Sequence, residues 1–318
     1  MHVPTPRGSA RVPMRDIHRF ADMNDHGATT EMAPAASRFR IRGWHVLAAA
    51  ILVAYFPVLY DLVLDWATDD NYSHGFLVPL VAGYFLWRDR ARWRQMEFRY
   101  TPAGWLAIAA ALGIFIVGTA GAEYFTARCS LVLLLFGLVW TFGGRAALRP
   151  AWFPIAYLLF MIPIPYVIYY TATFPLQLLA SKAAGVGLNL IGVPHLRQGN
   201  IIHLPGYSLE VAEACSGLRS LVSLLALGAA YARLTQPRLG WQIALFACTV
   251  PIALAANVFR VWATALGAYA ISPKVAEDFL HEFSGVMVFV VSFMFLFVLG
   301  GIFYWWQHRR KPSSPPVR

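Results

Sequence analysis

Apolar runs of about 20 residues recur along most of the chain, and they limit the folds open to it. A run of this length can cross a bilayer as a helix, in which every backbone polar group is satisfied within the segment. The 318 residues are 58% hydrophobic and 13% charged, whereas soluble domains average about 45–50% and about 25%. We therefore predict an all-α polytopic membrane protein with about eight transmembrane helices, at residues 44–64, 72–87, 103–122, 124–142, 151–170, 216–232, 241–270 and 281–306.

Two stretches fit this pattern less simply. The run at 72–87 is short, but the basic sequence RDRARWR closes it, and it counts here as a span. The stretch at 174–192 is only moderately apolar and contains Lys182. An interfacial or re-entrant helix is therefore favoured there over a crossing one.

The charged residues give these spans an orientation. With the N-terminus inside, the arginines of loops 88–100, 143–150 and 232–239 and of the C-terminal tail are all cytoplasmic, as the positive-inside rule requires. The outer loops then hold most of the acidic residues of the spanning region. Both termini are therefore predicted to be cytoplasmic. The net charge of +10 belongs to the cytoplasmic membrane surface and predicts no nucleic-acid partner.

The chain is predicted to have three regions. Residues 1–43 are polar, rich in Pro, Gly and Ala, and form a disordered cytoplasmic extension; 44–306 form the transmembrane domain, and 307–318 a basic cytoplasmic tail. In the largest outer loop, 193–214, the sequence NIIHLPGYSLEV has β-like runs on either side of Pro205-Gly206, a type II turn signal. This favours a small extracytoplasmic hairpin before the sixth span. His195 and His203 are interpreted as ordinary residues of this loop.

Three chemically capable residues fall at one predicted depth. Cys215 lies at the outward end of the sixth span, and His281 begins the eighth span, also at the outer face. Arg260 lies in the seventh span, where nineteen residues at about 1.5 Å each place it about 28 Å from the inner end. That is close to the outer edge of a hydrocarbon core about 30 Å thick.

This placement suits thiol chemistry. A cation or a helix N-terminus stabilises a thiolate, and Cys215 has both, since Arg219 follows one turn later on the same face. The helix dipole at His281 favours neutral imidazole, the form that acts as a base. A buried Arg260 can stabilise an oxyanion or hold a substrate carboxylate. Taken singly, these residues have plainer interpretations: Cys215 as a small apolar residue, His281 as an interfacial histidine, and Arg260 as an arginine that reaches the lipid headgroups.

Four short motifs stand in the chain: DDNYSHGFLVP at 69–79, EACSGLRSL around Cys215, NVFRVW around Arg260 and HEFSG at His281. In this order and spacing they resemble the exosortase/archaeosortase family of membrane transpeptidases, and the resemblance covers about residues 44–306. It implies a Cys–Arg–His catalytic set, which maps to Cys215, Arg260 and His281. Supporting residues are predicted nearby, namely Glu213, Ser216, Gly217, Arg219 and Asn257.

The resemblance also implies substrates and a location. Substrates would be exported proteins with a C-terminal sorting signal made of a Pro-Glu-Pro-type motif, a membrane helix and basic residues. The enzyme would sit in a bacterial inner membrane, with its active site facing the periplasm, and pass the cleaved protein through a thioester to a surface acceptor. Tyr72, Ser73 and His74 are candidates for lining the same cleft, and the alternative is an interfacial turn with an aromatic anchor.

Other functions stay open. A transporter or lipid flippase would also use intramembrane charge, but nearer the midplane and with an internal repeat. A non-catalytic assembly factor for exopolysaccharide export would tolerate loss of Cys215. A serine or metalloprotease is disfavoured, because the sequence has neither GxSxG nor HExxH. The acceptor is left open among lipid, sugar, peptide and water, and with it the choice between transpeptidase and protease.

The cysteines imply no further cofactor chemistry. Cys129, Cys215 and Cys248 form neither a disulfide framework nor a metal-type CxxC pair. We expect no metal and no organic cofactor, and we interpret Cys129 and Cys248 as small apolar residues of the spans.

Overall fold

The computed structural model describes the backbone of residues 36–211, 217–272 and 279–309, and side chains within these ranges from residue 45 to 211, 221 to 272 and 286 to 309 except His308. The chain divides into two units, Met1–Leu52 and Val53–Arg318. The division falls within the first helix, α1 (Ala36–Thr68). This helix begins eight residues before the predicted span, since the Ala- and Arg-containing segment 36–43 consists mainly of residues that tolerate a helix. The rest of the predicted extension lies outside the described residues.

After α1, a 3₁₀ helix, η1 (Asp70–Phe76), leads into α2 (Leu77–Arg88) and the short α3 (Arg90–Gln95). Next, α4 (Gly104–Ala120) packs along α5 (Tyr124–Tyr157) through small residues. A Cβ at Gly137 would come within 2.9 Å of the backbone nitrogen of Ile108. Glycine at this position therefore lets the two helices approach closely, as small residues do in membrane helix pairs.

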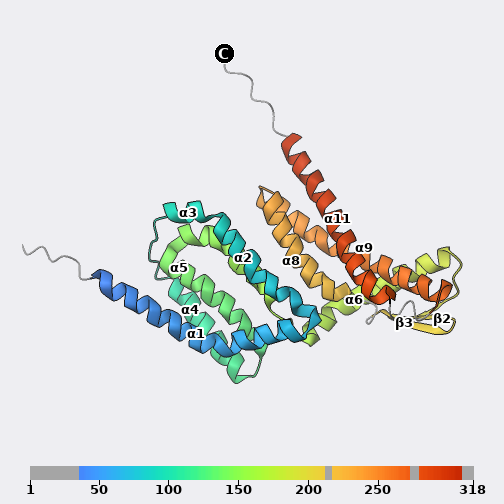
Figure 1. Ribbon diagram of the computed structural model, residues 1–318, viewed down its shortest axis with the longest axis horizontal. Helices are drawn as coiled ribbons and strands as arrows, with labels where there is room; N and C mark the ends of the chain where they lie inside the picture. Colours follow the sequence, from blue (N-terminus) through green and yellow to red (C-terminus); the bar gives the residue numbers. More distant parts are fainter. Residues whose placement is uncertain (1–35, 212–216, 273–278, 310–318) are drawn as a thin grey trace, which may run out of the picture. The chain divides into compact units, whose positions relative to one another are not determined.

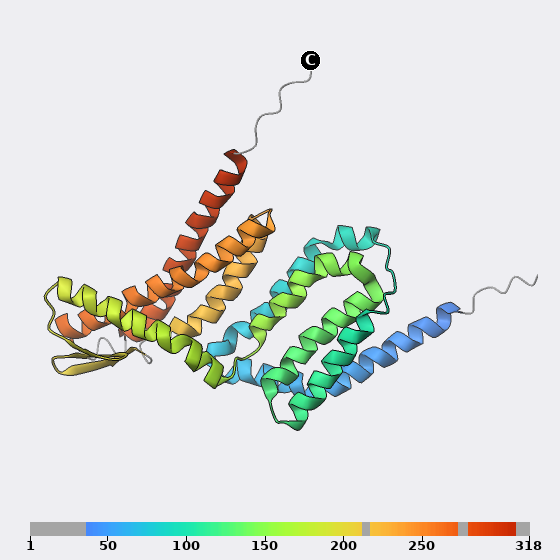
Figure 2. The ribbon, with the colours of Figure 1, turned by 180° about the vertical axis from the view of Figure 1, so that it is seen from behind.

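Helix α5 is bent into two limbs at Gly144 (Figures 1 and 2). The φ of Gly144 is +66°, a left-handed value that glycine adopts without strain, and a Cβ there would meet the Arg99 carbonyl oxygen at 2.8 Å. The limb before Gly144 covers the predicted span 124–142. The limb after Gly144 contains the first residues of the predicted span 151–170 but ends at Tyr157.

The predicted span 151–170 is therefore wrong as a single helix. After Tyr157 the chain forms the 3₁₀ turn η2 (Leu158–Met161), then an extended segment containing Pro163 and Pro165, and then α6 (Tyr166–Leu190). The two prolines lack a backbone donor and stop the helix. Helix α6 runs without a break through most of the stretch 174–192, for which a separate interfacial or re-entrant helix was predicted.

A three-stranded antiparallel sheet follows, with the order β1-β2-β3. Its strands are β1 (Leu196–Gln198), β2 (Ile201–Leu204) and β3 (Tyr207–Glu210). Strands β2 and β3 flank Pro205-Gly206, and the φ of Gly206 is +78°, as a type II turn requires. Strand β1 was not among the predicted elements.

Three long helices complete the chain: α8 (Gly217–Thr235), α9 (Leu239–Ala270) and α11 (Phe279–Arg309). They pack on one another, with Ala232, Leu245 and Leu296 forming a buried core. Gln236 donates from Nε2 to the Gly300 carbonyl oxygen (3.0 Å), so the last turn of α8 meets the last third of α11. The C-terminal ends of α8 and α11 lie together, so these two helices run parallel, whereas α9, joined to α8 by a short loop, runs antiparallel to α8.

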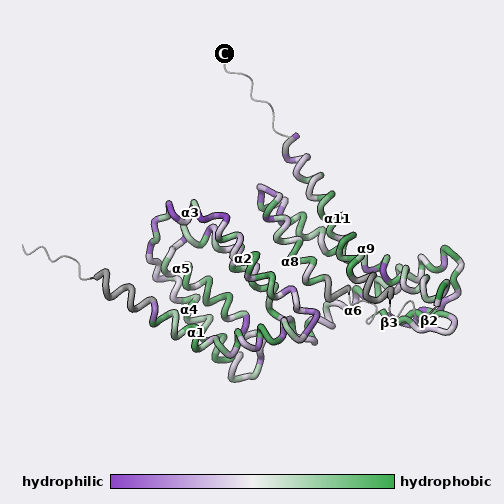
Figure 3. The backbone as a smooth tube through the Cα atoms, viewed as in Figure 1, coloured by the Kyte–Doolittle hydropathy of each residue, from purple (hydrophilic) through white to green (hydrophobic). Residues whose placement is uncertain are grey.

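Four helices of the described chain are long and apolar enough to cross a membrane: His45–Thr68, Tyr124–Met161, Leu239–Ala270 and Val286–Gln307. The apolar residues follow these helices, and the polar ones gather at α3 and other helix ends (Figure 3). The count of eight is not confirmed. The predicted spans at 72–87 and 103–122 form helices of 12 and 17 residues, shorter than the about 20 that a full crossing needs.

Candidate functional site

Arg260 is buried within α9. Its side chain is 2% exposed, and that of Asn257, one turn earlier on the same face, is 5% exposed. Each has an interaction partner. Burying a guanidinium costs free energy unless the group is paired or hydrogen-bonded. The surroundings of Arg260 in α9 therefore accommodate a positive charge.

The C-terminal half of α9 belongs to one apolar core. Val261 and Ala265 of α9 pack with Ala184 of α6 and Ile202 of β2, all with no exposed surface. The same core includes residues on both sides of Arg260, on β3 and α8, and at the end of the sheet segment: Val258, Trp262, Leu209, Val211 and Leu221.

This core holds the chain on both sides of Cys215. Val211 precedes Cys215 by four residues and Leu221 follows it by six, and both pack in the core that includes Val258 and Val261. Cys215 itself lies outside the described residues, as do Glu213 and Ser216 and the side chain of Arg219. Its two flanks are nevertheless anchored beside the segment of α9 that carries Arg260.

The packing of α8 on α9 determines which residues of the two helices lie at the same height along the bundle. Gly228 lies against the side chain of Thr249. From this contact, α8 runs back eleven residues to Gly217 and α9 runs forward eleven residues to Arg260, about 16 Å in each case. Because the helices are antiparallel, the start of α8 and Arg260 lie at about the same level.

His281 is the third residue of α11, and its side chain lies outside the described residues. The C-terminal half of α11 packs on the C-terminal part of α8, with the Tyr231 hydroxyl donating to the Phe297 carbonyl oxygen (3.2 Å). The first turn of α11 consequently lies at the end of the bundle where α8 begins. The roles of Cys215, Arg260 and His281 stay predictions.

The segment that carries Tyr72, Ser73 and His74 contacts α8 near the end where α8 begins (Figures 1 and 2). The Tyr72 hydroxyl donates to the Ile164 carbonyl oxygen (3.3 Å), and His74 Nε2 lies 3.1 Å from the Phe160 carbonyl oxygen, so Nε2 carries the proton. Ser73 is exposed. Two of these side chains are thus engaged with the backbone around η2, and their lining of a substrate cleft stays a prediction.

Burial lowers the pKa of His74, an effect that backbone hydrogen bonds with Phe160 and Asn71 oppose. His74 precedes α2 and is neutral at pH 7. The same segment is fixed by Trp66, whose indole N–H donates to the Met161 carbonyl oxygen (2.8 Å). The Trp66 ring occupies the space where a side chain on Gly75 would lie.

An ion pair that was not predicted from the sequence lies at the same predicted face. Asp65 at the end of α1 binds Arg128 near the start of α5, with Oδ2 and Nη2 2.6 Å apart, and Arg128 is 7% exposed. The signal was available, because Arg128 interrupts an apolar run just as Arg260 does. His195 and His203 have local partners, the Val193 carbonyl oxygen and the Ser208 hydroxyl. Among the described residues, no cluster of His, Cys, Asp or Glu is suited to a metal ion.

Comparison with protein-family models gives one informative match. The family described as transmembrane exosortase matches residues 66–298, most of the chain. The chain belongs to the transmembrane exosortase family. The resemblance of its four motifs to this family is confirmed. Comparison with curated proteins and with solved structures gives no match.

The exosortase match covers both groups of candidate residues. It begins at Trp66, just before η1, and ends within α11, so it includes Tyr72, His74, Cys215, Arg260 and His281. It lies inside the predicted transmembrane domain, 44–306. As an exosortase, the chain is a multi-pass membrane protein, and the apolar helices agree with this.

Proposed function

We propose that the chain is a membrane-embedded cysteine transpeptidase that cleaves the C-terminal sorting signal of exported proteins. The family match supports a sorting enzyme of this kind. The single observation that carries the assignment to these residues is the buried Arg260, whose α9 neighbours Val258 and Val261 pack in the core that also anchors both flanks of Cys215. A transporter would be expected to place such a charge nearer the midplane.

In the proposed topology, the apolar helices cross the bacterial inner membrane several times and both termini are cytoplasmic. The outer ends of α8, α9 and α11 and the small sheet then face the periplasm. The asymmetry of charge supports this orientation, since the arginines of 88–100, 143–150 and 232–239 lie at the other end of the spans.

The proposed reaction has two steps. The Cys215 thiolate attacks the scissile carbonyl carbon, and the tetrahedral intermediate collapses to a thioester as the C–N bond breaks. His281 takes the proton of the Cys215 thiol and gives it to the leaving amine; it then removes a proton from the acceptor nucleophile, which attacks the thioester, and returns that proton to the Cys215 sulfur that is released. Arg260 stabilises the negative charge on the thiolate or on the oxyanion.

The substrate in this proposal is an exported protein whose C-terminus carries a Pro-Glu-Pro-type motif, a membrane helix and basic residues. Docking of that helix among the spans would hold the cleavage site at the level of Arg260. Intramolecular positioning of this kind raises the effective concentration of the scissile bond at the thiolate.

The test is processing of a reporter with such a tail, co-expressed with the wild type or with Cys215→Ala, Arg260→Ala or His281→Ala. Loss of the mass shift in all three variants, at wild-type protein levels, is the expected result. Cys248→Ala is the matched control, since Cys248 is a half-buried cysteine of α9 and should leave processing unchanged. Full processing by Cys215→Ala would refute the thiol mechanism, and the mass of the new C-terminus identifies the acceptor.

A further inference from the structure

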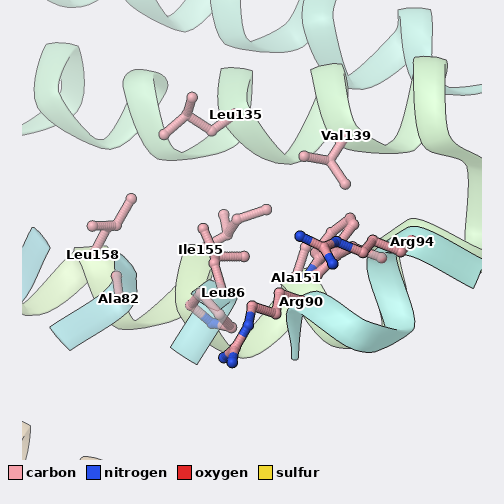
Figure 4. A pocket seen from close by; sticks show the side chains of 11 residues that line it. Ala82, Leu86, Arg90, Arg94, Leu135, Val139, Ala151, Ile155 and Leu158 are labelled. Atoms are coloured by element: carbon pink, nitrogen blue, oxygen red, sulfur yellow. The ribbon is translucent and has the colours of Figure 1, made fainter. Parts of the chain in front are cut away.

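A second site lies away from Cys215 and Arg260. An open cavity of about 580 Å³ is lined by residues of α2, α3, the two limbs of α5 and the start of η2 (Figure 4). Leu86, Leu135, Val139, Ile155 and Leu158 give it apolar walls. Its volume falls in the range of about 300–1,000 Å³ that is usual for small-molecule sites.

Two arginines of α3 stand at the edge of this cavity. Helix α3 contributes Arg90 and Arg94 to the lining, and the helix carries three arginines and no acidic residue. The Arg90 guanidinium lies 4.2 Å from the centroid of the Trp87 ring, which holds it at the rim. Arg94 has no hydrogen bond or ion pair with any residue that the structure describes, and Glu97 binds Arg99 instead (3.1 Å).

Trp93 adds a hydrogen-bond donor at the same edge. It lines the cavity, and its indole nitrogen is buried without a hydrogen-bond partner among the described side chains and backbone. A buried N–H that makes no hydrogen bond is costly, so a ligand oxygen in the cavity would be favourable there. An apolar body with two guanidinium groups and one N–H at its end matches an acyl chain ester-linked to a phosphate headgroup.

We propose that this α3 cavity binds an anionic glycerophospholipid. The phosphate lies at Arg90 and Arg94, an ester oxygen accepts from Trp93, and an acyl chain packs on Leu135 and Val139. Basic residues beside a membrane span attract anionic lipid. The proposed sorting-signal helix fits the cavity less well, because its own basic tail would meet these arginines. The site does not depend on the catalytic assignment.

The experiment is native mass spectrometry of the full-length protein in detergent with equal amounts of dioleoyl phosphatidylglycerol and dioleoyl phosphatidylcholine. The wild type should retain phosphatidylglycerol preferentially. Arg90→Gln and Arg94→Gln should each lower that retention about fivefold. Arg92→Gln is the matched control, since Arg92 belongs to α3 but does not line the cavity.

A further variant tests the contribution of the apolar walls of the cavity. Val139→Phe fills the cavity with the arginines in place and should reduce retention of phosphatidylglycerol. Size-exclusion profiles check the fold of each variant. Equal retention of the two lipids by the wild type would overturn the proposal, as would an effect of Arg92→Gln equal to that of Arg94→Gln, which would mean diffuse surface attraction. Unchanged retention in Val139→Phe would also overturn it, because the lipid would then lie outside the cavity.

Discussion

Gly228 of α8 lies so close to Thr249 of α9 that a Cβ on residue 228 would overlap the threonine hydroxyl. This contact sets the register of two antiparallel helices. It therefore determines that the start of α8, two residues after Cys215, is level with Arg260.

The first prediction tests this contact. Gly228→Ala should destabilise the protein by about 1–3 kcal/mol, because the added methyl group forces α8 and α9 apart. Thermal unfolding in detergent measures the change. Gly113→Ala is the control, since no atom lies within 4 Å of a Cβ built there on α4, and it should stabilise by about 0.5–1 kcal/mol. Equal effects of the two substitutions would mean that the contact does not set the register.

The second prediction concerns Arg128, whose guanidinium is buried against Asp65. Asp65→Asn should lower the free energy of unfolding by about 1–3 kcal/mol, because a buried charge loses its partner. Replacing both residues, as in Asp65→Asn with Arg128→Met, should recover part of the loss. Asp61→Asn, one turn earlier on α1, serves as the control. Additive losses in the double variant would argue against a coupled pair.

The third prediction is a pH dependence. Burial holds the pKa of His74 below its usual value of 6.5, so the folded state disfavours protonation. Neutral His74 therefore contributes stability above about pH 6.5, and that contribution is lost as the pH falls through the lowered pKa of the folded state. The unfolding temperature of His74→Gln should fall less between pH 7 and pH 5 than that of the wild type. His45→Gln, at an exposed position on α1, should follow the wild type.

The fourth prediction tests the partnership of Arg260 with the proposed nucleophile. In a background with Cys129→Ser and Cys248→Ser, iodoacetamide can react with one cysteine. Arg260→Gln should slow the alkylation of Cys215 at pH 7 by about tenfold or more, because the thiolate loses a stabilising cation. Arg233→Gln, in the last turn of α8, should leave the rate unchanged. An unaltered rate of alkylation in Arg260→Gln would show that Arg260 does not stabilise the Cys215 thiolate.

Composition and motifs were enough to predict a helical membrane protein and its family. Long apolar runs have few structural solutions in lipid, and each motif is local in sequence. The turn at Pro205-Gly206 was also predictable, because it depends on the conformational preferences of two residues. Runs of apolar residues did not reveal where helices break, so the end of α5 at Tyr157 and the continuous α6 differ from the prediction.

The sequence by itself determined that this is a transmembrane exosortase with an arginine, Arg260, inside a long apolar run. Only the tertiary structure decided which helices meet around that arginine, that Arg128 pairs with Asp65, and that α3 lines one edge of an apolar cavity. These features depend on contacts between residues far apart in the chain. Such contacts follow from how closely small residues such as Gly137 and Gly228 let helices approach, and hydropathy alone does not record that distance.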